Sequence, residues 1–232
     1  MVRIEGLQKL TLLDYPEQVA CTVFTGGCNF CCPFCHNGDL LPIKDTVGQW
    51  SEAQLLEFLH KRRSILDGVC ITGGEPLLQK ELPVLLRQIK ALGYQIKLDT
   101  NGSFPDRLEE LVADGLVDYV AMDIKNSLER YSETTGCMRS VLEPVKRSVD
   151  FLLQGKVPYE FRTTVVRELH DRQSMLAISQ WISGAQRYFL QGFVDSEHVV
   201  QKGLHGYTAA ELEQLRQCML PLVPKARLRG IA

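Results

Sequence analysis

Short apolar runs alternate along the chain with longer segments of helical periodicity. The runs have the length and the β-branched or aromatic content of buried strands. They lie at 19–24, 68–72, 95–99, 118–124, 160–166, 187–193 and, with the weakest pattern, 226–231. In most of the intervening segments, apolar residues recur three and four positions apart, which is typical of one face of a helix. The pattern therefore predicts strands and helices in alternation.

Sequence signals at their ends support several of the predicted helices. Ser51 and Gln54 form a capping box that opens a helix predicted at 52–63. A glycine directly follows each of two others, predicted at 81–92 and 140–154, as expected for a helix that ends in a left-handed turn. Further helices are predicted at 106–114, 174–183 and 209–219.

This alternation predicts an α/β fold with a parallel sheet, because parallel strands are joined by right-handed helical crossovers. A full barrel, a partial barrel and a doubly wound sheet all satisfy the pattern. No repeat, low-complexity tract or Pro/Ser-rich linker divides the sequence, so one domain over residues 1–232 is expected. In each of these architectures the functional site lies at the carboxyl ends of the strands.

Composition and charge exclude several classes of partner. The chain has 26 Lys and Arg against 28 Asp and Glu and is 45% hydrophobic, which is typical of a folded domain. The basic residues are scattered and the net charge is −2, so nucleic acid is not an expected partner. No apolar run approaches the ~18 residues of a membrane span. The first residues carry an acid where a signal peptide would be apolar, so we expect a cytoplasmic protein.

Polar and flexible residues follow most of the predicted strands. Because these ends share one edge of a parallel sheet, the residues should border one site. They are 25–28, 73–76, 99–102, 122–125, 162–164 and 191–193.

Four of the eight cysteines lie within one short segment after the first predicted strand. Cys28, Cys32 and Cys35 have the spacing C-x3-C-x2-C, and in a reducing compartment such a cluster suggests a metal rather than disulfides. A cubane iron–sulfur cluster normally takes four thiolates, so three would leave one iron open to another ligand. The alternative is zinc, bound by all four of these cysteines, Cys31 included, or with His36 as a ligand. The other four are expected to be small core residues: Cys21, Cys70, Cys137 and Cys218.

The cysteine spacing, with Phe34 before the last cysteine, resembles the signature of radical S-adenosylmethionine (SAM) enzymes. Gly73-Gly74-Glu75-Pro76 is similar to the motif that contacts the methionine amino group in that superfamily. More narrowly, the chain resembles the activating proteins of glycyl radical enzymes, above all those of anaerobic ribonucleoside-triphosphate reductase. The segments that carry this likeness are 6–10, 13–16, 24–28 and 35–37.

The resemblance implies a partial parallel (β/α)6-type barrel that holds one [4Fe-4S] cluster on Cys28, Cys32 and Cys35. SAM would chelate the open iron. A second cluster is not implied, since residues 39–50 contain no cysteine. The residues implied to contact SAM are Phe34, Gly73, Gly74, Glu75, Asp99, Thr100, Met122, Asp123, Lys125 and Arg162. Those from Asp99 to Lys125 are also implied as possible ligands of a monovalent cation.

The resemblance further implies a reaction and its partners. The reduced cluster would cleave SAM to methionine and a 5′-deoxyadenosyl radical, which would take a hydrogen atom from a glycine of the reductase. A flavodoxin or ferredoxin would donate the electron. The alternatives are an activase of another glycyl radical enzyme such as a formate lyase, a radical SAM enzyme acting on a small molecule such as a deazapurine precursor, and a zinc or iron–sulfur binding module without catalysis.

Several of these residues also have purely structural explanations. Gly73 to Pro76 could form a plain strand-to-helix turn, and Asp99 a turn acceptor. Lys125 could be a solvated strand end. Arg162 lies in an apolar strand where a charge needs a partner, which could be a structural ion pair or SAM. The sequence leaves open whether His36, His198 and His205 line the site.

Overall fold

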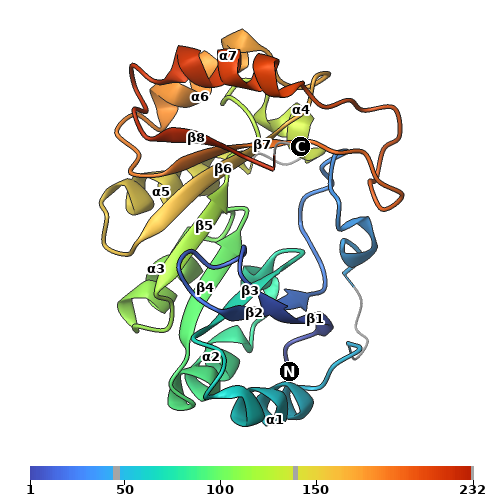
Figure 1. Cartoon of the computed structure of the whole chain (residues 1–232), viewed down its shortest axis with the longest axis vertical. Helices are drawn as coiled ribbons and strands as arrows, with labels where there is room; N and C mark the ends of the chain where they lie inside the picture. The colour runs from blue at the N-terminus through green and yellow to red at the C-terminus, as the bar shows by residue number, and fades with distance from the viewer. Residues whose placement is uncertain (44–47, 138–140, 231–232) are drawn as a thin grey trace.

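The computed structural model describes residues 1–43, 48–137 and 141–230. Its eight strands form one sheet in the order β1-β2-β3-β4-β5-β6-β7-β8, which is also their order in the sequence. The strands from β2 to β8 are all parallel to their neighbours, and β1 is antiparallel to β2 (Figure 1). The predicted α/β class with a parallel sheet is therefore confirmed.

Every predicted strand is present, within a few residues of its expected ends. Buried apolar residues fill the parallel strands because helices cover one face and the barrel interior the other. The seven are β2 (Ala20–Thr25), β3 (Gly68–Gly73), β4 (Gln95–Thr100), β5 (Tyr119–Asp123), β6 (Tyr159–Val165), β7 (Tyr188–Gly192) and β8 (Ala226–Arg229). Residue 231, the end of the last predicted strand, lies outside the described residues.

The predicted helices are also present. The capping box at Ser51 forms, with Ser51 Oγ accepting from the Gln54 amide at 3.1 Å. Gly93 and Gly155 adopt φ of 92° and 69° after their helices, as expected for left-handed ends. The helices are α1 (Glu52–Arg62), α2 (Leu82–Ala91), α3 (Pro105–Ala113), α5 (Leu142–Leu153), α6 (Arg172–Trp181) and α7 (Ala209–Met219). The start predicted for α5, residue 140, lies outside the described residues.

Some elements were not predicted. The strand β1 (Ile4–Thr11) is half-exposed and contains Gly6, so it lacks a continuous apolar run. The helix α4 (Tyr131–Thr135) is only five residues long. Two 3-10 helices, η1 (Gly38–Leu40) and η2 (Pro76–Leu78), are single turns. Helices this short carry too few residues to show a period.

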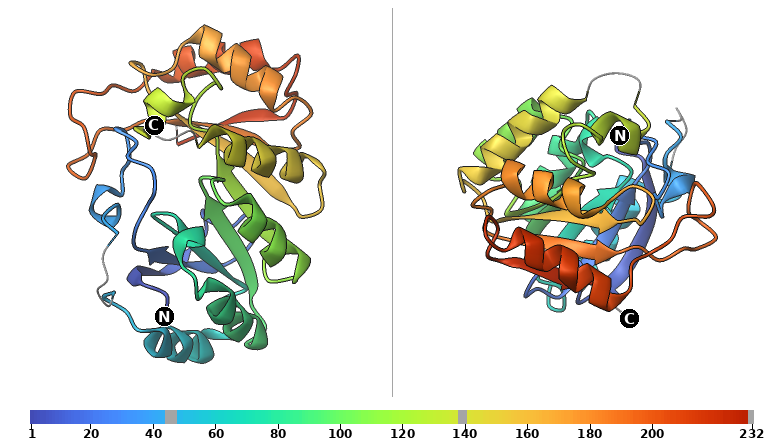
Figure 2. Two further views of the ribbon diagram at one scale, coloured as in Figure 1. Left: turned by 180° about the vertical axis from the view of Figure 1, so that it is seen from behind. Right: turned by 90° about the horizontal axis from the view of Figure 1, so that it is seen from above.

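The sheet curves into a partial barrel with its helices on the outside (Figure 2). Its two outer strands, β1 and β8, do not pair with each other, so the barrel stays open along one side. The predicted partial barrel is confirmed.

Among the described residues, no helix has both the length and the apolar character that crossing a bilayer requires.

Candidate active site

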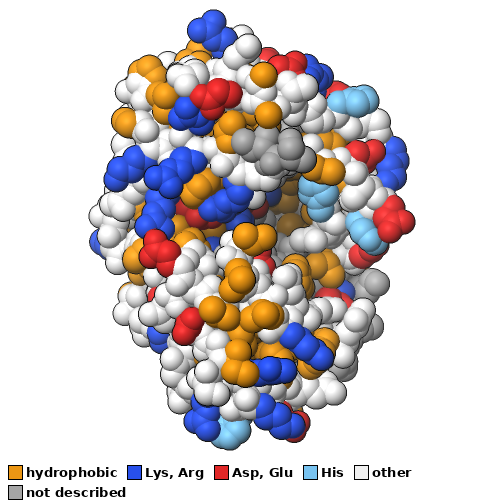
Figure 3. Space-filling model, viewed as in Figure 1, with side chains coloured by type: hydrophobic (Ala, Val, Ile, Leu, Met, Phe, Trp, Pro, Cys, Tyr) orange, Lys and Arg blue, Asp and Glu red, His pale blue; other side chains and the backbone are white. Residues whose placement is uncertain are grey.

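A cavity of about 220 Å³ lies at the carboxyl ends of the parallel strands. In Figure 3 the surface is hollowed near the middle of the molecule. Eleven of the thirteen residues that the sequence placed at the site line this cavity. They are Cys28, Cys32, Phe34, Cys35, Gly73, Gly74, Asp99, Thr100, Asp123, Lys125 and Arg162. The exceptions are Glu75 and Met122.

The cysteine loop brings three of its four thiols to the cavity. Cys28, Cys32 and Cys35 are lining residues, whereas Cys31 is exposed and absent from the lining. The amide of Cys31 donates to the Thr135 carbonyl at 2.9 Å, which fixes the loop against α4. The three cysteines of the C-x3-C-x2-C motif are thus the same three that line the cavity. Elsewhere Cys21 and Cys70 are buried, as predicted, while Cys137 and Cys218 are partly buried.

Burial and one nearby cation set the protonation of these thiols. Burial raises the pKa of Cys28 to about 11 and that of Cys32 to about 12. The charge of Lys125 is the largest effect that opposes burial at Cys32 and Cys35, because a cation favours the thiolate. A cationic iron–sulfur core would act in the same direction, since metal ligands must be thiolates.

The chain after the cysteines folds back over the same loop. Gly27 and Cys28 donate their amide hydrogens to the carbonyls of Leu40 and Leu41, at 2.7 and 3.1 Å. Through this return, Asn37 and Leu41 reach the cavity, and Asn37 Nδ2 contacts the Gly73 carbonyl at 3.4 Å. The prediction missed both residues as site residues, because no spacing rule shows where a loop returns.

The two glycines after β3 allow the backbone to pass close to the cysteine loop. Gly73 has φ 117°, which favours glycine. A Cβ on Gly74 would lie 2.1 Å from the Gly27 carbonyl oxygen. Pro76 then begins η2, which agrees with the expectation that it suits a first helical turn. The glycines are therefore required by the close packing of this turn against the loop before Cys28.

Glu75 lies behind the cavity wall and holds this turn. Its side chain is fully buried, and its oxygens accept from the Leu77 amide, the Thr100 hydroxyl and the Asn101 amide at 3.0, 2.9 and 2.7 Å. Burial raises its pKa to about 7, although these hydrogen bonds favour the carboxylate. These contacts show that Glu75 supports the turn after β3.

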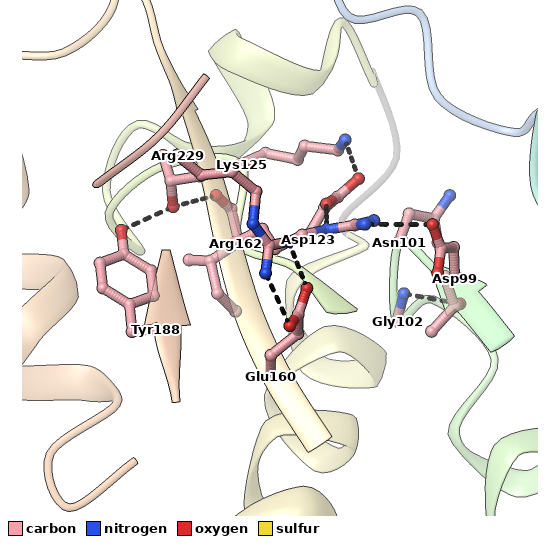
Figure 4. A network of polar contacts seen from close by, with 12 residues as sticks. Asp99, Asn101, Gly102, Asp123, Lys125, Glu160, Arg162, Tyr188 and Arg229 are labelled. Atoms are coloured by element: carbon pink, nitrogen blue, oxygen red, sulfur yellow. Dashed lines mark hydrogen bonds and ion pairs between the residues drawn. The ribbon is translucent and has the colours of Figure 1, made fainter. Parts of the chain in front are cut away.

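Five charged side chains form an alternating row across the inner face of β4, β5 and β6, shown in part in Figure 4. We call it the charged row: Lys97, Asp99, Arg162, Asp123 and Lys125. Arg162 joins its middle, with Nη1 and Nε each 3.0 Å from an oxygen of Asp99 and of Asp123. Lys125 pairs with Asp123 at 2.9 Å, and the buried Lys97 pairs with Asp99. Arg162 and Asp99 are thus ion-paired inside the fold, and Lys125 is not a free strand end.

The row keeps all of its members charged. Burial alone would raise the pKa of Asp123, but the charges of Arg162 and Lys125 lower it overall. Burial alone would lower the pKa of Lys125, but Asp123 raises it overall. Burial likewise opposes the charge of Asp99, and Arg162 and Lys97 bring its pKa below the usual value. The cavity wall is therefore a fixed zwitterionic surface.

A buried histidine that the sequence did not single out supports this wall. His170 has one ring nitrogen, Nε2, 2.9 Å from the Lys125 carbonyl, while Nδ1 accepts from the Val166 amide at 3.1 Å. Its ring lies edge-on to Phe34 with centroids 6.3 Å apart. The Lys125 ammonium lies 5.9 Å from the centroid of the same Phe34 ring. His170 thus helps to position both Lys125 and Phe34.

Of the three histidines whose place the sequence did not decide, the structure puts one at the cavity and two away from it. His36 lines the cavity, stacks on Phe193 at 5.4 Å and contacts the Val194 carbonyl through Nε2 at 2.7 Å. His198 and His205 do not line it. His205 pairs with Glu168, and the exposed His198 lies 3.4 Å from Asp39.

The donor set fits an iron–sulfur cluster. Three thiols from one loop share a cavity with the charged row, and each could bind a different iron of a cubane. Within the described part of the chain, no three His, Cys, Asp or Glu side chains are grouped as ligands of one metal ion. The single-ion zinc alternative therefore gains no support from the side-chain positions.

Comparison with known proteins agrees with this geometry. Residues 22–176 match the family model of the radical SAM superfamily, and the chain belongs to that superfamily. It is thus an enzyme of the class that uses a [4Fe-4S] cluster and SAM for radical chemistry.

Individual relatives and solved structures show which members of the superfamily this chain is similar to. A protein of Methanocaldococcus jannaschii, provisionally named a glycyl-radical enzyme activating enzyme, is 31% identical over 82% of this chain and 79% of its own length. The pyruvate formate-lyase-activating enzyme of Clostridium pasteurianum is 32% identical over 54% of this chain and 53% of its own. Other relatives carry the names of small-molecule enzymes. The crystal structure of Streptococcus suis SuiB bound to SAM superposes with a TM-score of 0.69 at 12% identity, over 88% of this chain and 48% of that one.

Proposed function

We propose that Cys28, Cys32 and Cys35 hold the [4Fe-4S] cluster of this enzyme and that the charged row holds SAM beside it. The observation that carries the assignment is that these three thiols, and not Cys31, share one cavity with a fixed zwitterionic wall. When bound and reduced, the cluster supplies the electron that cleaves SAM to methionine and a 5′-deoxyadenosyl radical.

The chain's own residues would bind and orient the cofactor. SAM carries an ammonium, a carboxylate and a sulfonium, so it needs partners of both signs. Asp99 and Asp123 offer carboxylate oxygens, and Lys125 and Arg162 offer cationic donors on the same wall. Gly73, Gly74 and Thr100 present backbone or hydroxyl groups near the thiols, and Phe34 an apolar surface. Glu75 acts from behind, by holding Thr100 and the glycine turn in place.

We further propose that the radical is passed to a backbone glycine of a protein partner, the anaerobic ribonucleoside-triphosphate reductase. This proposal is supported by the relatives named as glycyl-radical enzyme activators and by the segments 6–10 and 13–16, whose likeness is to activators of that reductase. A flavodoxin or ferredoxin as electron donor and a monovalent cation at Asp99 or Asp123 belong to the same proposal. A formate-lyase-type partner is the second candidate, favoured by the relative from Clostridium.

The test is anaerobic. The protein is reconstituted with iron and sulfide and reduced, and 5′-deoxyadenosine formed from SAM is measured for wild type, Cys32→Ala and Cys31→Ala. We expect the Cys31 variant to keep the activity and the Cys32 variant to lose it, because only Cys32 lines the cavity. Metal analysis in parallel counts iron and zinc. Zinc without iron, or equal loss in both variants, would contradict the ligand assignment.

The partner is tested by adding the anaerobic ribonucleoside-triphosphate reductase of the same genome and recording its electron paramagnetic resonance spectrum. We expect a glycyl radical that requires SAM and this protein. A formate-lyase-type enzyme is run beside the reductase. SAM cleavage without a radical on either protein would instead favour a small-molecule substrate.

A further inference from the structure

A second cavity, of about 410 Å³, has no residue in common with the SAM site. One of its walls is formed by residues at or near the amino ends of β6 and β7 and along β8. The other wall is formed by Pro16 and Glu17, in the loop that joins β1 to β2. We call this cavity the seam.

The seam is strongly cationic. Its β7–β8 wall carries Arg187, Lys225, Arg227 and Arg229, against the two acids Glu17 and Glu160. In Figure 3, Lys and Arg side chains gather beside the central hollow. Arg229 neutralises Glu160 through a bidentate pair at 2.6 and 3.0 Å, so the remaining groups carry a net charge of about +2.

Two of these cations contact other side chains of the protein, and two are exposed to solvent. Arg187 donates to the Tyr119 hydroxyl at 3.2 Å, and Arg229 stacks on Phe189 at 3.6 Å. Lys225 and Arg227 are exposed, and among the described residues neither has an ion pair or side-chain hydrogen bond. The two unpaired cations next to two fixed ones make a preformed surface for carboxylates.

Three exposed leucines come shortly before the Pro16–Glu17 wall of the seam in the sequence. Leu10, Leu12 and Leu13 expose 55%, 69% and 87% of their surface, just before the Pro16–Glu17 turn that lines the seam. Hydrophobic side chains form a patch below the hollow in Figure 3. Contiguous exposed apolar groups of this kind mark protein contact sites. These leucines lie in and beside segments 6–10 and 13–16, to which the cavity chemistry gives no role.

The residues that follow the exposed leucines are held in place by contacts with the rest of the protein. Tyr15 is buried and packs against Tyr119 with ring centroids 6.0 Å apart, and Asp14 accepts from the Thr22 hydroxyl at 2.6 Å. Tyr119 in turn donates to Glu160 at 3.0 Å. One tyrosine pair thus connects the two walls of the seam.

We propose that the seam docks an extended acidic segment of the protein partner, with alternating side chains directed at the cations and at the leucines. The cations that line the seam and the exposed leucines before Pro16 differ in chemistry, as the side chains on the two faces of a bound strand can. This inference rests on the proposed function, since it gives the glycyl radical enzyme its docking surface.

The first test needs no catalytic turnover and no known partner. The reconstituted protein is titrated calorimetrically with the peptide Ac-Glu-Leu-Glu-Leu-Glu-Glu-NH2 and with its lysine counterpart. We expect the acidic peptide alone to bind. The double variant Lys225→Glu, Arg227→Glu should weaken that binding about tenfold, because each exposed charge contributes modestly and reversal adds repulsion. The matched control is Arg62→Glu on α1.

The leucines are tested in the same way. Leu12→Ser with Leu13→Ser should weaken the acidic peptide severalfold, whereas Ile65→Ser, at a site 50% exposed elsewhere, should leave its affinity unchanged. Binding that is equal for both peptides, or unchanged in both seam variants, overturns the proposal.

The second test uses the reductase and separates the two proposals. For the Lys225, Arg227 double variant we expect an unchanged rate of 5′-deoxyadenosine formation without partner, but a tenfold higher concentration of reductase for half-maximal glycyl radical. Raising the salt concentration should reduce the difference from wild type. Equal activation by wild type and variant overturns the seam while the function stands. Peptide binding at the seam without a radical on the reductase overturns that choice of partner while the seam stands.

Discussion

His170 should make the stability of the fold fall as the pH falls. The residue is buried and held by the Lys125 carbonyl and the Val166 amide. Burial lowers its pKa from 6.5 to about 4, although its contacts with the carbonyl oxygens of Lys125 and Val166 favour the protonated ring. The unfolded chain therefore takes up a proton at a higher pH than the folded protein does. The contribution of the buried neutral His170 to the free energy of unfolding is complete above pH 6.5 and is lost as the pH falls toward 4.

The size of the effect follows from these two values. Between about pH 7.5 and pH 5, the difference in proton uptake lowers the free energy of unfolding by about 2 kcal/mol. Glu75 acts in the opposite direction, because its raised pKa of about 7 makes the folded state the better proton acceptor. The pH dependence of the free energy of unfolding of the wild-type protein therefore reports the sum of both contributions. The contribution of His170 alone is obtained by comparison with a variant that lacks the imidazole.

The assay is urea unfolding of the apoprotein under reducing conditions at both pH values. His170→Gln should be less stable at the higher pH, yet lose about 2 kcal/mol less than wild type on acidification. Tyr207→Phe is the control: it removes a 2.6 Å hydrogen bond to the His170 carbonyl but keeps the imidazole, so its pH dependence should match wild type. The reasoning fails if His170→Gln and wild type show the same loss.

Other substitutions test the walls of the SAM site. Gly74→Ala should lower the free energy of unfolding by about 2 kcal/mol in urea titrations, because its Cβ would overlap the Gly27 carbonyl. Glu75→Gln should cost about 2 kcal/mol, since an amide nitrogen would face groups that donate hydrogen bonds; Glu75→Asp should not restore it. Arg162→Met should cost about 3 kcal/mol by leaving two carboxylates without their shared cation, and SAM affinity measured by calorimetry should fall as well. A change below 0.5 kcal/mol in any of the three would contradict its contact.

The sequence predicted the parallel strands and the cavity well because both depend on local signals. Buried strands such as β3 appear in the sequence as continuous apolar runs. The spacing of the three cysteines can likewise be read within one short segment, without knowing the rest of the fold. The edge strand β1 was missed because only one side of it is buried and Gly6 interrupts its pattern. The helix α4 was missed because five residues show no period.

The remaining site residues depend on contacts distant in the sequence. Asn37 and Leu41 reach the cavity only through the return of the chain over Gly27 and Cys28. His170 lies 45 positions from the Lys125 carbonyl that it contacts. Glu75 was among the predicted site residues, but its burial behind the cavity wall depends on η2 and on Thr100, which the motif alone does not contain.

The charged row also constrains how this protein can change over evolutionary time. Each interior member is shared by two neighbours, so replacing one with a neutral residue leaves a buried neighbour uncompensated. Substitutions at these positions are therefore accessible only in pairs of opposite sign, or as exchanges that preserve the sign. In an alignment of homologues, Asp99, Asp123 and Arg162 should covary with one another rather than drift separately.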